Sequence, residues 1–145
     1  MKTLLLVVGV VITMSCWSQT NVPSAVQSSF TKLFPGITVK KWDKEEGKYE
    51  ANFTKEGKQM SAVFDVKGNL EETETVIAVD QLPAPVVPYV KEHYKGSKIE
   101  EAAMVLKSDG EKIYEAEIKG KDLLFDAKGN FLKEETEKDE SKEKD

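Results

Sequence analysis

Very few side chains in this sequence could act as catalytic nucleophiles or as soft metal ligands. The 145 residues include one cysteine, Cys16, and one histidine, His93. Nucleophilic catalysis needs a nucleophile, a base and an orienting group, and a zinc site needs several His or Cys ligands. A lone histidine beside the apolar stripe of a helix is most often structural. The sequence therefore predicts no catalytic residues, no metal site and no cofactor.

Carboxylates are the one abundant reactive group, with 26 Asp and Glu residues in the chain. A pair of them could in principle hydrolyse a substrate by acid–base chemistry. They stand, however, at alternating strand positions or beside lysines, as in residues 43–46 and 133–135, which is typical of a solvated face. Residues 71–74 are acidic but lack the spaced oxygen ligands and the glycine of a calcium loop. We therefore expect no enzyme activity.

Two similar loops, Asp65-Val66-Lys67-Gly68-Asn69 and Asp126-Ala127-Lys128-Gly129-Asn130, contain the oxygen-bearing residue types of cation sites. Each offers only two side chains that could bind a cation, which is too few. A hairpin turn with the glycine in the left-handed region accounts for every residue.

The charge of the chain argues against nucleic acid as a partner. The formal net charge is −5, and all 21 basic residues are lysines, because the sequence contains no arginine. Arginine is the side chain that reads phosphate and guanine with two parallel hydrogen bonds. An acidic chain without it is a poor candidate for nucleic-acid binding.

The first 18 residues are typical of an export signal. A short positive segment, Met1-Lys2-Thr3, precedes an apolar and glycine run over residues 4–12, followed by small and polar residues. That run is too short to span a bilayer of about 30 Å, so residues 1–18 are interpreted as a cleaved signal peptide. We expect an exported protein, periplasmic or extracellular, with no transmembrane segment in the mature chain.

Cys16 lies at the end of this segment, where two processing routes compete. Cleavage after Ser18, which we favour, would remove the cysteine. Alternatively, Thr13-Met14-Ser15-Cys16 is a loose lipoprotein box, and lipidation of Cys16 would anchor the domain to a membrane. Either route excludes an intramolecular disulfide.

The rest of the chain is a tandem duplication. Pro23, Val26, Phe34 and Gly36 correspond to Pro83, Val86, Tyr94 and Gly96, and residues 64–70 correspond to residues 125–131. A repeat of about 60 residues is the length of one supersecondary unit. We assign residues 19–80 to the first repeat and residues 81–135 to the second. The charged residues 136–145 are predicted to form a disordered tail.

Each repeat is predicted to form a helix followed by about four antiparallel strands. Val26, Phe30, Leu33 and Phe34 form one apolar helical stripe. Apolar and polar residues then alternate along residues 49–54, 59–65 and 114–119, which indicates strands with one buried and one wet face. The predicted fold is α+β, with both helices packed on one face of a sheet of about eight strands. The other face would stay open.

These motifs resemble the PepSY-like, beta-lactamase-inhibitor-like family of secreted Bacteroidota proteins. The similarity rests on Phe34-Pro35-Gly36 after the helix, on Trp42, and on residues 49–53 and 64–70, and it covers about residues 22–135. The second repeat departs from it, because Ala102 stands near the position equivalent to Trp42. The resemblance implies a tandem helix-plus-sheet fold, no catalysis, and a protein-binding or inhibitory role in the envelope.

Trp42 is the candidate residue for partner binding. If Ile37 and Val39 face the helices, strand alternation puts Trp42 on the open face, where an amphipathic aromatic side chain suits an interface. A β-bulge would instead return Trp42 to the core. The leading functional hypothesis is an exported binding domain that contacts an envelope protein or peptide through the open face. The alternative is a periplasmic carrier or scavenger of small molecules.

Overall fold

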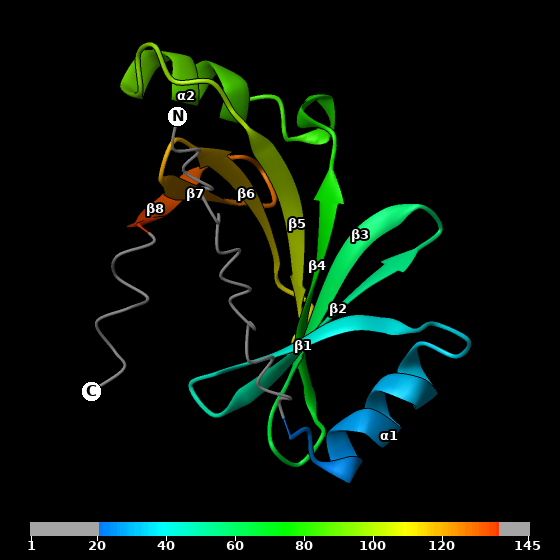
Figure 1. Cartoon of the computed structure of the whole chain (residues 1–145). Helices are drawn as coiled ribbons and strands as arrows, with labels where there is room; N and C mark the ends of the chain where they lie inside the picture. Colours follow the sequence, from blue (N-terminus) through cyan, green and yellow to red (C-terminus); the bar gives the residue numbers. More distant parts are fainter. Residues whose placement is uncertain (1–20, 137–145) are drawn as a thin grey trace, which may run out of the picture.

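The computed structural model describes residues 21–136, which form two helix-plus-sheet halves joined by a short 3-10 helix (Figure 1). The first half contains α1 (Ser24–Leu33), β1 (Val39–Glu45), β2 (Lys48–Lys55), β3 (Lys58–Phe64) and β4 (Leu70–Ile77). After η1 (Val79–Gln81), the second half contains α2 (Val86–His93), β5 (Glu101–Lys107), β6 (Lys112–Ile118), β7 (Lys121–Asp126) and β8 (Phe131–Thr136).

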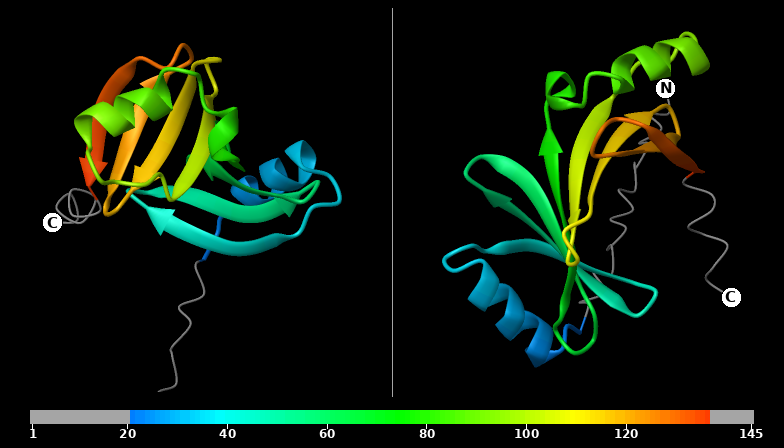
Figure 2. Two further views of the ribbon diagram at one scale, coloured as in Figure 1. Left: turned by 90° about the horizontal axis from the view of Figure 1, so that it is seen from above. Right: turned by 180° about the vertical axis from the view of Figure 1, so that it is seen from behind.

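All eight strands belong to one antiparallel sheet, in which they follow one another in chain order from β1 to β8. The two halves join where β4 pairs with β5. Along β4, Thr73 lies opposite Ala62 of the first core, and Ile77 lies opposite Ala102 of the second core. Because residues four apart on a strand share a face, both helices cover the same face. The predicted architecture is confirmed, and Figure 2 shows both helices on the outer side of the curved sheet.

Each helix buries its apolar stripe against its own strands, so the molecule has two hydrophobic cores. Val26 and Phe30 of α1 pack against Phe53 and Phe64. In the second half, α2 packs in the same way against alternate residues of β5, β6 and β7. One detail of the predicted stripe is wrong: Leu33 is 48% exposed, because the stripe continues through Phe34.

The β3–β4 and β7–β8 turns also pack on the helices. Gly68 and Gly129 both have φ +86°, which confirms the predicted left-handed glycines. The Asp65 carboxylate accepts hydrogen bonds from the backbone N–H groups of Lys67 and Asn69, as expected of a turn. A Cβ atom on Gly68 would lie 2.6 Å from the carbonyl oxygen of Ala25 in α1. The turn glycine therefore also lets the hairpin approach the helix closely.

The predicted signal peptide, Cys16 and all but the first residue of the predicted tail lie outside the described residues, and that first residue, Thr136, ends β8. Among residues 21–136, no helix is long and apolar enough to cross a membrane.

Substituting Gly68 tests the contact between turn and helix. Gly68→Ala should lower the free energy of unfolding by about 3 kcal/mol, since it combines a left-handed backbone with a clash against helix backbone. Gly57→Ala is the matched control, because φ is +77° there but a Cβ atom would meet nothing within 4 Å. We expect it to lower the free energy of unfolding by only about 1 kcal/mol. Urea unfolding measures both, and equal losses would show that the close approach to α1 is unimportant.

Candidate functional site

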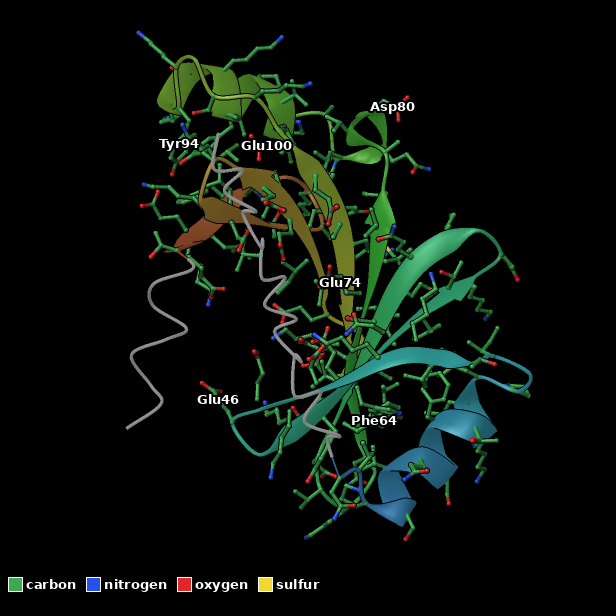
Figure 3. The ribbon with its side chains drawn as sticks, viewed as in Figure 1. Glu46, Phe64, Glu74, Asp80, Tyr94 and Glu100 are labelled. Atoms are coloured by element: carbon green, nitrogen blue, oxygen red, sulfur yellow. The ribbon has the colours of Figure 1, made fainter. Side chains whose placement is uncertain are left out.

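The face of the sheet that carries no helix is strongly acidic. Strand register shows which carboxylates project from this face: they alternate along each strand with the core residues, whose side chains project from the helix-covered face. We call seven of these carboxylates the acidic face: Glu50, Glu74, Glu101, Glu115, Glu117, Asp122 and Glu135; register places Asp43, Glu72 and Asp126 on the same side. Figure 3 shows Glu74 between the two halves of the sheet, on the concave side, while Phe64 lies toward α1.

Part of the acidic face is a row of carboxylates in direct cross-strand register. Glu101 of β5 pairs with Glu117 of β6, Glu117 with Asp122 of β7, and Asp122 with Glu135 of β8. Like charges directly opposite one another destabilise a sheet. Glu117 and Asp122, in the middle of this row, each take part in further interactions within the described residues, so the row is not a set of isolated charges.

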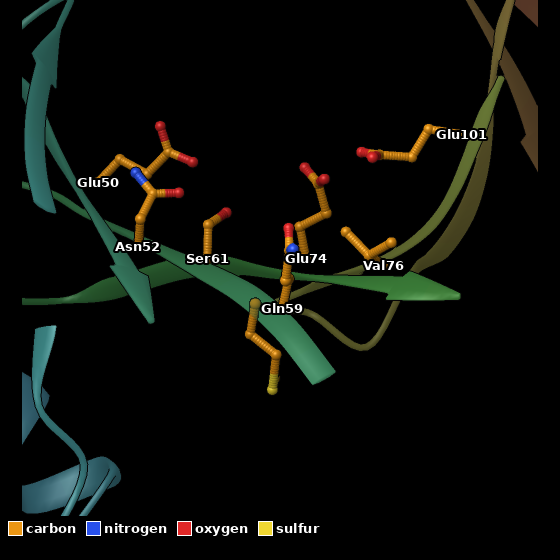
Figure 4. A pocket seen from close by; sticks show the side chains of 8 residues that line it. Glu50, Asn52, Gln59, Ser61, Glu74, Val76 and Glu101 are labelled. Atoms are coloured by element: carbon orange, nitrogen blue, oxygen red, sulfur yellow. The ribbon is translucent and has the colours of Figure 1, made fainter. Parts of the chain in front are cut away.

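A small polar pocket lies on the same face, between the two halves. Its volume is about 160 Å³, and it is lined by Glu50, Asn52, Gln59, Met60, Ser61, Glu74, Val76 and Glu101. Figure 4 shows the side chains of Glu50, Ser61, Glu74 and Glu101 directed toward this common space.

Ser61 is the most buried of the residues that line the pocket. The residue is only 8% exposed, and its hydroxyl points into the pocket (Figure 4). Among the described residues, the side-chain oxygen that is both fully buried and without a hydrogen-bond partner is Thr54 Oγ1, not the Ser61 hydroxyl. Ser61 therefore contributes an ordinary polar group, both donor and acceptor, to the wall of the pocket.

Two carboxyl groups of the acidic face hold their protons near neutral pH. Burial raises the pKa of Glu74 from 4.5 to about 7, and the negative charges of Glu50 and Glu101 add to the effect. Burial raises the pKa of Glu115 to about 8, with further contributions from Glu74 and Asp122. Desolvation and neighbouring carboxylates both oppose ionisation.

Lysines are found around the acidic face and not at its centre. Lys133 pairs with Glu135 on β8, Lys41 with Asp43 at 2.7 Å on β1, and Lys107 lies 3.9 Å from Glu72. In the described part of the chain, neither Glu74 nor Glu115 forms an ion pair. The lysine ion pairs of this side of the sheet therefore involve residues other than Glu74 and Glu115.

The described residues do not include three His, Cys, Asp or Glu side chains placed to hold a metal ion together. The carboxylates are spread over strands from β2 to β8, whereas metal ligands must converge within about 2.6 Å of one ion. Chemically, the arrangement suits several cationic groups spread over a surface.

Trp42 lies on the helix side of the sheet. The register of β1 shifts between Val39 and Lys41, and Trp42 then pairs with Ala51, a buried core residue. The indole ring lies 5.8 Å from the ring of Phe30 and 6.4 Å from that of Phe64. The structure thus selects the bulge over the open-face placement. A role for Trp42 in partner binding stays a prediction.

His93 lies on the exposed side of α2, away from the acidic face. Its ring stacks on that of Tyr89, with centroids 4.0 Å apart, and its Nδ1 lies 3.0 Å from the Tyr89 carbonyl oxygen. Both contacts are made within α2.

Sequence reasoning missed Glu74 and Ser61 as members of a site. Strand alternation does indicate that Glu50, Glu115 and Glu117 are on the wet face, because Tyr49, Ala51 and Ala116 are apolar. It does not indicate that a curved sheet brings carboxylates from both repeats together.

One family model matches the chain. It is described as "Putative beta-lactamase-inhibitor-like, PepSY-like", and it matches residues 13–71 and again residues 47–133. No curated protein matches the chain.

Several solved structures are similar. A "putative periplasmic" protein of Bacteroides eggerthii has a TM-score of 0.71 at 19% identity, covering 79% of this chain and 88% of that one. A DUF2874 family protein of Bacteroides uniformis has a TM-score of 0.70 at 20% identity, with the same coverage. These two show the shared fold. A BLIP-like protein of Bacteroides fragilis has a TM-score of 0.59 at 26% identity, covering 79% of this chain and 86% of that one.

The raised pKa values predict that the folded protein becomes less stable as pH rises. The folded state keeps protons on Glu74 and Glu115 that the unfolded chain releases above pH 4.5. The contribution of these two carboxyls to the free energy of unfolding is therefore complete below about pH 4.5, and it is lost as pH rises through about 7 and 8. Glu74→Gln, which keeps the neutral form, should make the protein more stable than wild type at pH 8.5, by about 1–2 kcal/mol, and equal to it near pH 4.5.

Urea unfolding at both pH values measures this difference. Glu92→Gln, on the exposed outer side of α2, removes the same charge far from the acidic face and should leave the pH dependence of wild type. If the free energy of unfolding fell equally with rising pH in wild type and in Glu74→Gln, the raised pKa of Glu74 would be contradicted.

The location of Trp42 predicts a loss of stability when it is truncated. Trp42→Ala removes ring contacts with Phe30 and Phe64 and should cost about 2–4 kcal/mol. Leu33→Ala is the control, because Leu33 is a large apolar residue that is 48% exposed, and a change within about 0.5 kcal/mol is expected. Denaturant unfolding measures both variants; wild-type stability of Trp42→Ala would show that the indole does not support the core.

Proposed function

The chain belongs to the PepSY-like family, and we propose that it is an exported, non-enzymatic domain that binds an envelope protein or peptide through its open sheet face. The observation that carries the proposal is the contrast between the two faces. The helix-covered face holds both hydrophobic cores. The other face carries carboxylates from both repeats and a polar pocket between the two halves.

The shape of the sheet supports a protein or peptide as the partner. The helices lie on the outer side, so the concave side remains accessible across both halves (Figure 2). A polypeptide can contact several strands of such a surface at once. The pocket, at about 160 Å³, is smaller than the roughly 300–1,000 Å³ that ligand pockets usually enclose. This favours a macromolecular partner over a small-molecule cargo.

The relatives support the proposed location and class. The B. eggerthii protein is described as a putative periplasmic protein, and the B. fragilis protein is described as BLIP-like. An envelope location also agrees with the signal peptide predicted over residues 1–18.

A charge-neutral block of the open face tests the proposal. Gln59 is exposed and lines the pocket on β3, so Gln59→Trp adds bulk at the proposed interface without changing charge. Ser28→Trp adds the same side chain on the exposed side of α1. Immobilised wild type and Ser28→Trp should both retain the same envelope protein in stoichiometric amount, and Gln59→Trp should retain it at least about tenfold less.

Circular dichroism would first establish that both variants are folded. Equal retention by all three proteins would place the contact elsewhere on the surface. Failure of the wild type to retain any envelope protein in stoichiometric amount would contradict the proposed function.

A further inference from the structure

We infer that charged residues on the two outer strands, β1 and β8, keep separate copies of this chain from joining end to end through their sheets, with Glu45 against Glu135 as the main repulsive pair. The inference concerns a second copy of the chain and is independent of the proposed function.

The pairing of β4 with β5 shows how one repeat joins the next. β4 is the last strand of the first repeat, β5 is the first strand of the second, and they pair along residues 72–77 and 102–107. The sheet ends at β1, a first strand, and at β8, a last strand (Figure 1). Among residues 21–136, each of these two strands pairs with one neighbour only. An unpaired strand edge is a template for another chain, so β8 of one copy and β1 of the next present the same two edges that meet between β4 and β5.

The duplication fixes which residues would meet in such a pairing. Trp42 of β1 and Ala102 of β5 are equivalent, because each pairs with the corresponding alanine of the following strand. Leu70 of β4 and Phe131 of β8 are equivalent, because each pairs with the corresponding phenylalanine of the preceding strand. Counting along the strands from these positions aligns β1 with β5 and β8 with β4.

Two carboxylates would meet where the inner strands have a compatible contact. Between β4 and β5, Glu74 lies opposite Val105, which is 8% exposed. The equivalent residues of the outer strands are Glu135 and Glu45. Pairing of two copies would therefore place one carboxylate directly opposite another, an arrangement that destabilises a sheet.

The adjacent positions add to the mismatch. Glu46 would lie opposite Glu134, a second pair of like charges. An ion pair also crosses between the inner strands, where Lys107 lies 3.9 Å from Glu72. The position equivalent to Lys107 is Gly47, in the turn after β1, so an attractive contact of the inner pair is lost between the outer strands.

The acidic residues of β8 are ionised and already bound within their own chain. Lys133 pairs with Glu135, and Lys121 pairs with Glu134 at 2.9 Å. The Tyr94 hydroxyl also donates a hydrogen bond of 2.6 Å to Glu134. The hydrogen bonds from Lys121 and Tyr94 lower the pKa of Glu134. Both lysines are thus engaged and do not offset an incoming carboxylate of a second copy.

Keeping the outer strands apart matters because the contact would be head to tail. A row of joined copies would still have a free β1 edge at one end and a free β8 edge at the other, so pairing would continue into an open chain. Natural sheets limit this hazard with charged, short or bulged edge strands. β1 has all three features: it is rich in charge, it ends two residues earlier than β5 in the alignment, and its register shifts between Val39 and Lys41.

Sedimentation velocity of two double variants, both neutral in charge, tests the inference. Lys44→Met with Glu45→Val gives exposed residues of β1 the residue types that β5 has at the equivalent positions. Lys112→Met with Glu111→Val makes the same exchanges at exposed residues where the inner strand β6 begins. Wild type and the β6 variant should stay monomeric up to about 1 mM. The β1 variant should self-associate, with a dissociation constant at least about tenfold below that limit.

Two further measurements keep the test decisive. Circular dichroism would first establish that each variant is folded, and hydrogen exchange of the associated β1 variant should show new protection in β1 and β8 alone. Glu45→Lys is a second variant: opposite Glu135 it would restore an acid–lysine contact, so it should associate at low ionic strength and dissociate as salt is added. Glu111→Lys carries the same charge change and should stay monomeric.

Four results would overturn the inference. Monomeric behaviour of both the β1 double variant and Glu45→Lys would show that charge is not what keeps copies apart. Equal association of the β1 and β6 double variants would assign the effect to added apolar surface. New protection on strands other than β1 and β8 would place the contact elsewhere. Association of the wild type itself through β1 and β8 would show that the edges are not protected.

Discussion

Burial of two apolar helical stripes, one in each repeat, against the same face of one sheet is the interaction on which this structure depends. Phe30 of α1 and Val90 of α2 are each almost fully buried, at 3% and 2% exposure, at the centre of their own cores. No disulfide can form within this chain, which has one cysteine, so stability must come from apolar burial and backbone pairing. Using both helices on one face leaves the opposite face uncovered.

Because both cores lie on the helix-covered face, the concave face can carry a cluster of carboxylates that does not add to the stability of the fold. The row from Glu101 to Glu135 lies on the other side of the sheet from both cores and is separated from them by the backbone. Glu74 and Glu115 adapt by keeping their protons. Surfaces that depart from the most stable arrangement are often binding sites.

The two repeats share a fold but differ in what they contribute. Trp42 pairs with Ala51, and Ala102 pairs with Ala116, so the two occupy equivalent places on the helix side. The first core fills this place with an indole, and the second fills it with a methyl group. On the open face, the second repeat supplies the in-register row, while the first supplies Glu50, Ser61 and Glu74. The pairing of β4 with β5 brings these contributions together.

Much of the fold follows from the sequence, because its patterns are local. The duplication, the helical stripes, the strand alternation and the turn glycines at Gly68 and Gly129 each depend on residues close along the chain. The helix side of Trp42 could not be predicted, since one β-bulge reverses every side chain that follows it. The grouping of Glu50, Glu74 and Glu115 depends on strand register and sheet curvature. Those are properties of packing between distant segments, so only the tertiary structure decides them.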